Sequence, residues 1–179
     1  VQQENNAITR ERLLVVNMID YYKSYQKLSN TIQKQKTFLV KKYRVNKKLT
    51  VEKQLLELHY RVDEVPRSLV LVQAANESAW GTSRFARVGL NFFGIWCYRE
   101  GCGMVPNGRN QGSKHEVQAF KTVDASVARY LHNINTNRAY RVFRAIRAQL
   151  REQQQPLSAE ILATGLLPYS ERGSAYVLE

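Results

Sequence analysis

Apolar residues recur at helical spacing along the first third of the chain. Residues 1–9 open with a mainly polar run and are expected to form a frayed terminus. Beyond them the steps between apolar residues alternate four and three, which marks one face of a helix. The residues on this stripe are Leu14, Met18, Tyr21, Tyr25, Leu28 and Ile32. A second helical stretch follows at 36–43, and Thr50 is the expected N-cap of a helix that ends near Arg61.

The next apolar segment leads to an acidic residue in an unusual setting. Asp63 to Pro66 predicts a helix start, with acid near the positive end and proline in the first turn, and Trp80-Gly81 predicts the helix end. The body is apolar almost all round, which predicts burial on several sides. Glu77 lies at the C-terminal end, where helix carbonyls and burial both disfavour a charged carboxylate. A carboxyl group that keeps its proton can act as a general acid. The alternative is a structural ion pair with Arg84 or Arg87.

The middle of the chain changes character. Most of the glycines lie between Gly89 and Gly112, among turn dipeptides. Residues 97–98 and 104–105 are expected to pair as a small hairpin, and 116–120 alternate like a short strand. Helices return after Asp124, which we interpret as an N-cap. The pattern predicts a mainly α fold, of α+β type, with one small β region.

The charge of the chain favours an anionic partner. There are 27 Lys and Arg against 15 Asp and Glu, a net charge of +12. Residues 10–67 hold fourteen basic and six acidic residues, about two thirds of the excess. Nucleic acid and the anionic polymers of a bacterial envelope both fit such a surface. The absence of an aromatic-rich basic motif argues against nucleic acid, and no apolar run reaches the ~18 residues of a membrane span. We make no prediction of the oligomeric state.

The two cysteines lie close together, at Cys97 and Cys102. A structural zinc site needs four soft ligands, and His59, His115 and His132 are scattered, so no metal site is expected. A disulfide that closes a short turn is favoured and would indicate an oxidising compartment. Two free thiols are the alternative.

Four motifs in the second part of the chain resemble one enzyme family. The segment Gln73–Gly81 resembles the signature of bacterial glucosaminidases, glycoside hydrolase family 73. Asn91–Ile95 resembles the asparagine-leucine-phenylalanine-glycine-isoleucine segment that follows in this family, and 120–123 resembles its next strand. Residues 169–176 resemble its C-terminal tyrosine motif, although the residues between the two tyrosines depart from the usual alanine-threonine-aspartate-proline run. The resemblance covers residues 60–179.

The resemblance implies both a fold and an activity. We expect a lysozyme-like helical domain at 49–179, with the β region as a small lobe beside a cleft, and a basic N-terminal helical extension at 1–48. The implied activity is that of a peptidoglycan hydrolase, an endo-β-N-acetylglucosaminidase that cuts glycan strands without a cofactor. A lytic transglycosylase, which needs one glutamate, and a non-catalytic glycan-binding module remain alternatives. We expect a cell-envelope location, periplasmic or secreted, with any leader outside these residues. The extension is expected to add affinity for anionic envelope polymers.

The resemblance also assigns roles to individual residues. Glu77 is implied as the proton donor, and the second carboxylate is expected at Glu116. Glu100, at the tip of the Cys97–Cys102 turn, is its rival and would suit gating of the cleft. Tyr169 is expected to bring its hydroxyl near the acetamido group of the sugar or the reacting centre. Substrate contacts are expected from Ser78, Trp80, Asn91, Phe92, Phe93 and Tyr176. The structural alternatives are an exposed strand-end glutamate for Glu116 and core packing for the aromatic residues.

Overall fold

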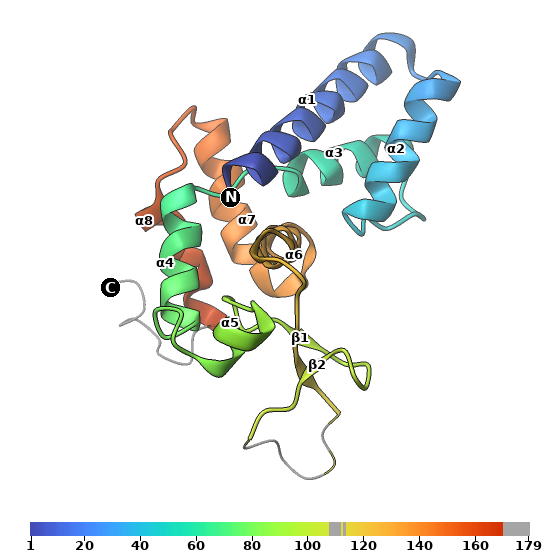
Figure 1. Cartoon of the computed structure of the whole chain (residues 1–179). Helices are drawn as coiled ribbons and strands as arrows, with labels where there is room; N and C mark the ends of the chain where they lie inside the picture. The colour runs from blue at the N-terminus through green and yellow to red at the C-terminus, as the bar shows by residue number, and fades with distance from the viewer. Residues whose placement is uncertain (108–111, 113, 170–179) are drawn as a thin grey trace. The chain divides into compact units, whose positions relative to one another are not determined.

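The computed structural model describes residues 1–107, 112 and 114–169, and this part of the chain is mainly helical with a small antiparallel sheet (Figure 1). The predicted fold class is therefore confirmed. The helices are α1 (Gln2–Tyr25), α2 (Asn30–Lys42), α3 (Val51–Arg61), α4 (Arg67–Glu77), α5 (Arg84–Gly89), α6 (Val123–Thr136), α7 (Arg141–Glu152) and α8 (Ala159–Ala163). The strands are β1 (Trp96–Cys97), β2 (Gly103–Met104) and β3 (Glu116–Gln118), and the 3-10 helices are η1 (Arg138–Tyr140) and η2 (Thr164–Tyr169).

The described residues form two compact units. One comprises residues 67–130, with α4, α5, the sheet and the start of α6. The other combines residues 2–66 with 131–169. Among the helices described, none has both the length and the apolar character needed to cross a membrane. The extension at 1–48 and the domain at 49–179 remain a prediction.

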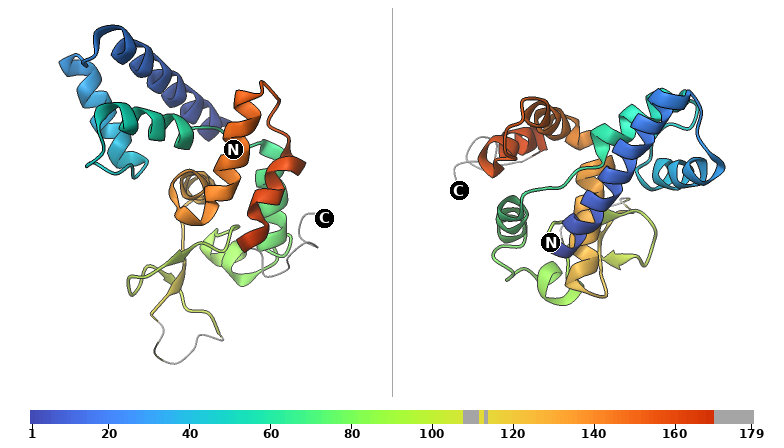
Figure 2. Two further views of the ribbon diagram at one scale, coloured as in Figure 1. Left: turned by 180° about the vertical axis from the view of Figure 1, so that it is seen from behind. Right: turned by 90° about the horizontal axis from the view of Figure 1, so that it is seen from above.

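In the unit formed by 2–66 and 131–169, α1 and α2 both pack against α3 (Figures 1 and 2). Fully or almost fully buried side chains fill this contact: Val15, Leu39, Tyr43, Leu55 and Leu58. Thr50 caps α3 as predicted, since its side chain accepts a hydrogen bond from the N–H of Lys53. Side chains from α1, from α2 and from the turn after α2 are therefore part of the core of this unit.

Two predictions about the N-terminal helices are wrong. The terminus is not frayed, because α1 begins at Gln2 and the buried Asn5 exchanges hydrogen bonds of 2.7 and 3.2 Å with the backbone of Val65. The apolar stripe is not one helix either. The helix ends at Tyr25, and the side chain of Ser29 begins α2 by accepting a hydrogen bond from the N–H of Ile32. A stripe can continue across such a break because both helices turn apolar faces to the same core.

A buried carboxylate joins the segment after α3 to α1 and α7. Asp63 accepts hydrogen bonds of 3.1 and 2.9 Å from Nε and Nη2 of Arg151. Arg12 Nη1 and Arg147 Nε lie 3.6 and 3.9 Å from its Oδ2 atom. Burial raises the pKa of Asp63, but the hydrogen bonds from Arg151 and the charges of the three arginines outweigh it, so that the pKa is lowered. Asp63 was expected to lie at the start of the next helix, but α4 begins only at Arg67. Asp63 is instead the carboxylate at the centre of a charge network with Arg12, Arg147 and Arg151.

The sheet lies in the unit of residues 67–130. Its strand order is β1-β3-β2, and both outer strands run antiparallel to β3, with Trp96 opposite Val117 and Gly103 opposite Gln118. The predicted hairpin of 97–98 with 104–105 is therefore wrong, because β3 lies between the two segments. A Cβ on Gly103 would overlap the Val117 carbonyl group, so the close approach of β2 to β3 requires glycine at this position.

Candidate functional site

Glu77 is the last residue of α4 and precedes a tight left-handed turn. Ala79, Trp80 and Gly81 have φ angles of +52°, +56° and +77°. The N–H of Trp80 donates a hydrogen bond of 2.7 Å to the Ala75 carbonyl, five residues earlier. This spacing is that of the Schellman motif at the end of a helix. Two consecutive non-glycine residues in this conformation cost about 1–2 kcal/mol each. Such strain beside an acidic side chain is typical of functional sites.

Ser78 stabilises this turn through two hydrogen bonds. Its side chain is buried, and its Oγ accepts a hydrogen bond of 2.7 Å from the N–H of Gly81. Its backbone carbonyl accepts a further bond of 3.1 Å from the N–H of Ser83, the residue that caps α5. Ser78 was predicted to contact substrate, and the geometry gives it a role in fixing the turn after Glu77.

Glu77 itself is exposed, whereas the sequence predicted burial. The prediction failed because α4 is not covered on all sides: Leu71 and Val72 are exposed as well. An apolar composition does not reveal which faces of a helix are packed. The carboxyl group lies near Gly94, where a Cβ would stand 3.8 Å from Glu77 Oε2. Arg84, one of the two candidate ion-pair partners, donates to the Val105 carbonyl at 2.7 Å.

Asn91 organises the loop that contains Gly94. Its Nδ2 donates hydrogen bonds of 2.8 Å to the carbonyls of Ile95 and Gln118, and its Oδ1 accepts bonds of 3.3 and 3.1 Å from the N–H groups of Phe93 and Ile95. The side chain is 1% exposed. Asn91 was predicted to contact substrate. These contacts make it the residue that ties the loop beside Glu77 to β3.

The three predicted sugar-stacking residues have different surroundings. Phe93 is buried and stacks on Tyr130, with ring centroids 4.0 Å apart, so it belongs to the core. Phe92 is half-buried and lies beside Gly81, where a Cβ would stand 3.8 Å from its ring. Trp80 is 82% exposed, on the left-handed turn that follows Glu77. Of the three, Trp80 offers the most open aromatic surface.

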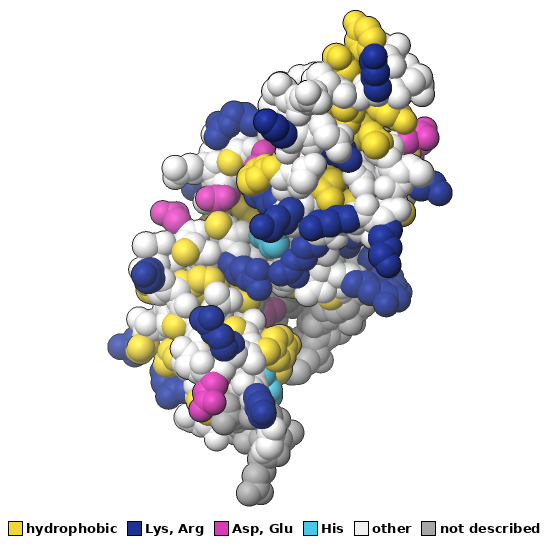
Figure 3. All heavy atoms as spheres, turned by 90° about the vertical axis from the view of Figure 1, so that its right-hand side faces the viewer, with side chains coloured by type: hydrophobic (Ala, Val, Ile, Leu, Met, Phe, Trp, Pro, Cys, Tyr) yellow, Lys and Arg dark blue, Asp and Glu magenta, His cyan; other side chains and the backbone are white. Residues whose placement is uncertain are grey.

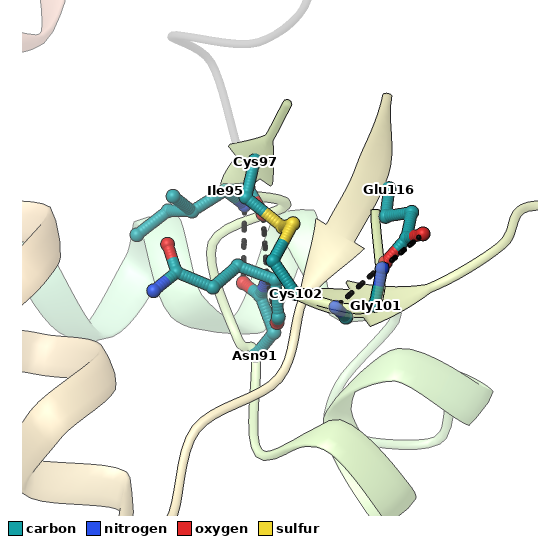
Figure 4. The surroundings of a disulfide bond; sticks show 8 residues. Asn91, Ile95, Cys97, Gly101, Cys102 and Glu116 are labelled. Atoms are coloured by element: carbon teal, nitrogen blue, oxygen red, sulfur yellow. Dashed lines mark hydrogen bonds between the residues drawn. A yellow bond between two sulfur atoms is a disulfide. The ribbon is translucent and has the colours of Figure 1, made fainter. Parts of the chain in front are cut away.

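Glu116 is buried and contacts the backbone of the loop between the two cysteines (Figure 4). Its Oε1 accepts a hydrogen bond of 2.9 Å from the N–H of Gly101, and its Oε2 accepts one of 2.8 Å from the N–H of Gly103. Cys97, its partner across the sheet, forms a disulfide with Cys102. The structural alternative of an exposed strand-end glutamate is therefore wrong. The carboxylate holds the disulfide loop, and Glu100 is exposed on that loop.

The two cysteines and Glu116 also bring ligand-type atoms within 4.8 Å of one another. This spacing alone would fit a metal ion. The two sulfur atoms are bonded to each other, however, and a disulfide provides no thiolate ligand. The cluster is explained by the disulfide and the hydrogen bonds of Glu116.

Both C-terminal tyrosines fall at or beyond the end of the described chain. Tyr169 is the last residue of η2, and its side chain lies outside the described part. Tyr176 lies wholly outside it. Their roles remain predictions.

Sequence reasoning missed Trp96, which opens β1 directly after the Asn91–Ile95 loop. Its indole is 49% exposed and stacks on the ring of His115, with centroids 4.2 Å apart and an interplanar angle of 6°. The signal in the sequence is its position immediately after the family-like segment. The pairing with His115 could not be foreseen, because it joins residues nineteen positions apart across the sheet.

The surface carries the charge that the composition predicts. On the face drawn in Figure 3, Lys and Arg side chains far outnumber those of Asp and Glu. Lys41, in the last turn of α2, and Lys47 and Lys48, in the loop that follows, are all exposed. They form part of the basic stretch that the sequence places before α3.

Comparison with known proteins gives two matches. The glucosaminidase family model, described as mannosyl-glycoprotein endo-beta-N-acetylglucosaminidase, matches residues 53–169, more than half of the chain. Protein bax of Escherichia coli (strain K12) is 35% identical over 181 aligned residues, which cover 98% of this chain. The chain spans 61% of the length of that relative. No solved structure matches the chain significantly. The resemblance to glucosaminidases found in the motifs around Glu77 is confirmed, and the identity to Protein bax supports a Bax-type member of that family.

Proposed function

Because this chain belongs to the glucosaminidase family, we propose that it is a glycoside hydrolase that cuts the glycan strands of peptidoglycan, with Glu77 as its general acid. In the finer form of the proposal it is an endo-β-N-acetylglucosaminidase. The substrate is a polymer of N-acetylated sugars, and the reaction adds water across a glycosidic bond.

The observation that carries the proposal is the setting of Glu77. Its side chain is exposed, so a substrate can reach it. Hydrogen bonds hold both the turn that follows Glu77 and the loop that lies near its carboxyl group. Ser78 and the left-handed turn hold the segment that follows. Asn91 holds the loop whose Gly94 lies near the carboxyl group. A general acid has to remain within hydrogen-bond reach of one substrate atom, and this arrangement limits how far the carboxyl can move.

The proposed reaction begins with proton transfer. Glu77 gives its proton to the glycosidic oxygen while the bond from that oxygen to C1 breaks, so the leaving sugar departs as a neutral alcohol. A second carboxylate stabilises the positive charge that develops at C1. Water then adds to C1 and releases a proton, which restores the starting protonation of the two acids. Neither a metal nor a cofactor takes part in these steps.

For the second carboxylate we propose Glu116, with Glu100 as its rival. The hydrogen bonds of Glu116 to Gly101 and Gly103 support a role in holding the loop that carries Glu100. The exposure of Glu100 supports access to water and substrate. The two residues have to be replaced separately to assign the role.

Further contacts with the substrate are proposed from the aromatic and tyrosine residues. Trp80 has the open surface that stacking on a sugar requires. Phe92 is proposed to border the same region. Tyr169 and Tyr176 are proposed to interact with the acetamido group or the reacting centre, as the family resemblance implies. Ser78 and Asn91 act on the substrate through the turn and the loop that they hold.

Two alternatives predict different products. A lytic transglycosylase needs one glutamate and forms an anhydro-sugar end without adding water. A non-catalytic glycan-binding module releases no product, and an exposed Glu77 in an intact motif favours the enzyme over this alternative. Mass spectrometry of products from purified peptidoglycan separates the three. We expect reducing-end N-acetylglucosamine; anhydro-muramate ends or an unchanged polymer would contradict the hydrolase.

The proposed setting is the cell envelope, periplasmic or secreted. A disulfide between Cys97 and Cys102 persists in oxidising compartments, which supports this location. The excess of basic residues in 10–67 supports peripheral association with anionic envelope polymers. Fractionation of cells that express the full-length protein tests the location directly.

A further inference from the structure

The indole of Trp96 is exposed to solvent, and a second ring stacks on one of its faces. It is 49% exposed, and the ring of His115 lies almost parallel to one of its faces at a centroid distance of 4.2 Å. Large aromatic side chains bury most of their area in ordinary cores. An indole that is held in place and still half-open has the form of a binding surface.

The backbone that carries this indole is fixed on both sides. Trp96 pairs with Val117 across the sheet, and the preceding Ile95 exchanges hydrogen bonds with the side chain of Asn91. The following residue, Cys97, pairs with Glu116 and forms the disulfide. Binding to such a side chain loses little conformational entropy, because the stack and the backbone already restrict it.

Trp96 also lies close to Glu77 along the chain path. Gly94, where a Cβ would stand 3.8 Å from the Glu77 carboxyl group, is two residues before it. Two residues span at most about 7 Å. The backbone of Trp96 is therefore within about 7 Å of Gly94, which is within the reach of a sugar polymer bound at Glu77.

We propose that Trp96 is a stacking platform for a pyranose ring of the glycan, in the subsite next to the bond that Glu77 cleaves. The apolar C–H face of a pyranose packs on the open face of the indole, while His115 supports the opposite face. The proposal rests on the function proposed above and adds a specificity-determining residue to it. His115 is a positioning residue, since it acts through the indole.

Fluorescence gives the most direct test, because the chain has two tryptophans, Trp80 and Trp96. In the double variant Trp80→Phe, Glu77→Gln, emission comes from Trp96 alone and turnover is suppressed. The probe is a tetrasaccharide of alternating N-acetylglucosamine and N-acetylmuramate. We expect a saturable change in emission. We also expect calorimetry to give a lower affinity for the His115→Ala variant, and an unchanged affinity for His115→Phe. An unchanged spectrum while calorimetry detects binding overturns the proposal, and the absence of any binding contradicts the proposed function on which it rests.

Kinetics on peptide-free glycan strands give a second, independent test. Trp96→Ala should raise KM about tenfold, the effect of losing one aromatic contact, and leave kcat within about twofold. Trp96→Phe should recover most of the loss. Ile161→Ala, which removes an apolar side chain of similar exposure on α8, should change neither constant. An unchanged KM in Trp96→Ala overturns the proposal while the wild type still cleaves. A wild type without cleavage contradicts the proposed function instead, and the fluorescence titration does not depend on turnover.

Discussion

The Oε2 atom of Glu77 lies 3.8 Å from the point where a Cβ on Gly94 would stand. This proximity brings together two motifs, because Glu77 belongs to the signature segment and Gly94 to the Asn91–Ile95 loop. Gly94 has a φ of +59°, which glycine adopts without strain. Glycine at this position therefore allows the backbone conformation of the loop and also leaves room for the Glu77 carboxyl group.

Substitution at Gly94 should separate these two effects. Gly94→Ala adds a methyl group at ordinary contact distance and about 1–2 kcal/mol of backbone strain, so stability should fall while part of the cleavage remains. Gly94→Val should displace the carboxyl group and remove most of the cleavage. Gly112→Ala is the matched control, because it has φ +89° and open space around the Cβ. Urea unfolding and cleavage rates provide the readout, and a Gly94→Val variant as active as the wild type would refute the contact's role.

Replacement of Glu116 tests whether it holds the loop. A glutamine can accept from one of the N–H groups of Gly101 and Gly103 but turns its own NH₂ toward the other. An unpaired buried donor costs about 1–3 kcal/mol, so the free energy of unfolding and cleavage should fall together.

Glu100→Gln is the matched variant for Glu116→Gln, since Glu100 is exposed on the same loop. Its stability should equal that of the wild type. A loss of cleavage in Glu100→Gln would identify it as the second carboxylate. If Glu116→Gln loses cleavage at unchanged stability, Glu116 acts on the substrate directly and the loop-holding role is secondary.

The charge network of Asp63 predicts a pH dependence of stability. Its pKa in the folded protein lies below the ordinary value of 3.8, so its stabilising contribution is complete above that pH and is lost as the pH falls below about 4. Asp63→Asn should cost about 3–5 kcal/mol at pH 7, because it leaves Arg147 buried without its counter-charge.

Urea unfolding of the wild type and Asp63→Asn between pH 7 and pH 3 measures this contribution. The difference in unfolding free energy should shrink at the acid end. Asp20→Asn, an exposed carboxylate on α1, should show little difference at any pH. A difference of constant size over the whole range would mean that Asp63 does not titrate as described.

The exposed lysines before α3 provide a test of wall affinity that preserves the fold. Deleting residues 1–47 would uncover Leu55 and Leu58, which α1 and α2 bury. Replacing Lys41, Lys47 and Lys48 by glutamine removes charge alone. Binding to intact walls should weaken most at low salt, because such charges are screened over about 10 Å at 0.1 M. Cleavage of short, peptide-free strands should be unchanged; equal wall binding by the variant and the wild type would exclude this role for the segment.

Local signals in the sequence predicted some helix ends and missed others, such as the start of α6, which begins at Val123 rather than after Asp124. Thr50 caps α3 and the helix ends at Arg61, as the cap residue and the apolar spacing indicate. The strand order was not predictable in the same way, since β1 pairs with β3 across about twenty residues and spacing gives no partner. The hairpin prediction assumed that neighbours in sequence pair, and the hydrogen bonds of Glu116 to the intervening loop favour a different arrangement.

For the candidate site, the motifs named two segments that the structure brings together, Glu77 and the Asn91–Ile95 loop, but they did not predict the surroundings of each side chain. Asn91 and Phe93 are in the family-like loop, and both turn inward, one to hydrogen bonds and the other to Tyr130. A sequence motif records that a residue matters without distinguishing substrate contact from support. Burial and partner atoms make that distinction, and they depend on tertiary packing that helical or strand periodicity does not contain.

Glu77→Gln tests the central claim most directly, with melting temperature and glycan cleavage measured on one preparation. Glutamine keeps the size of the side chain but has no proton to give, and loss of general-acid catalysis typically costs about 10²–10⁴ in rate. Because Glu77 is exposed, the melting temperature should change little. The account predicts lost cleavage at an unchanged melting temperature. Cleavage near the wild-type rate, or a large fall in melting temperature with cleavage retained, would contradict it.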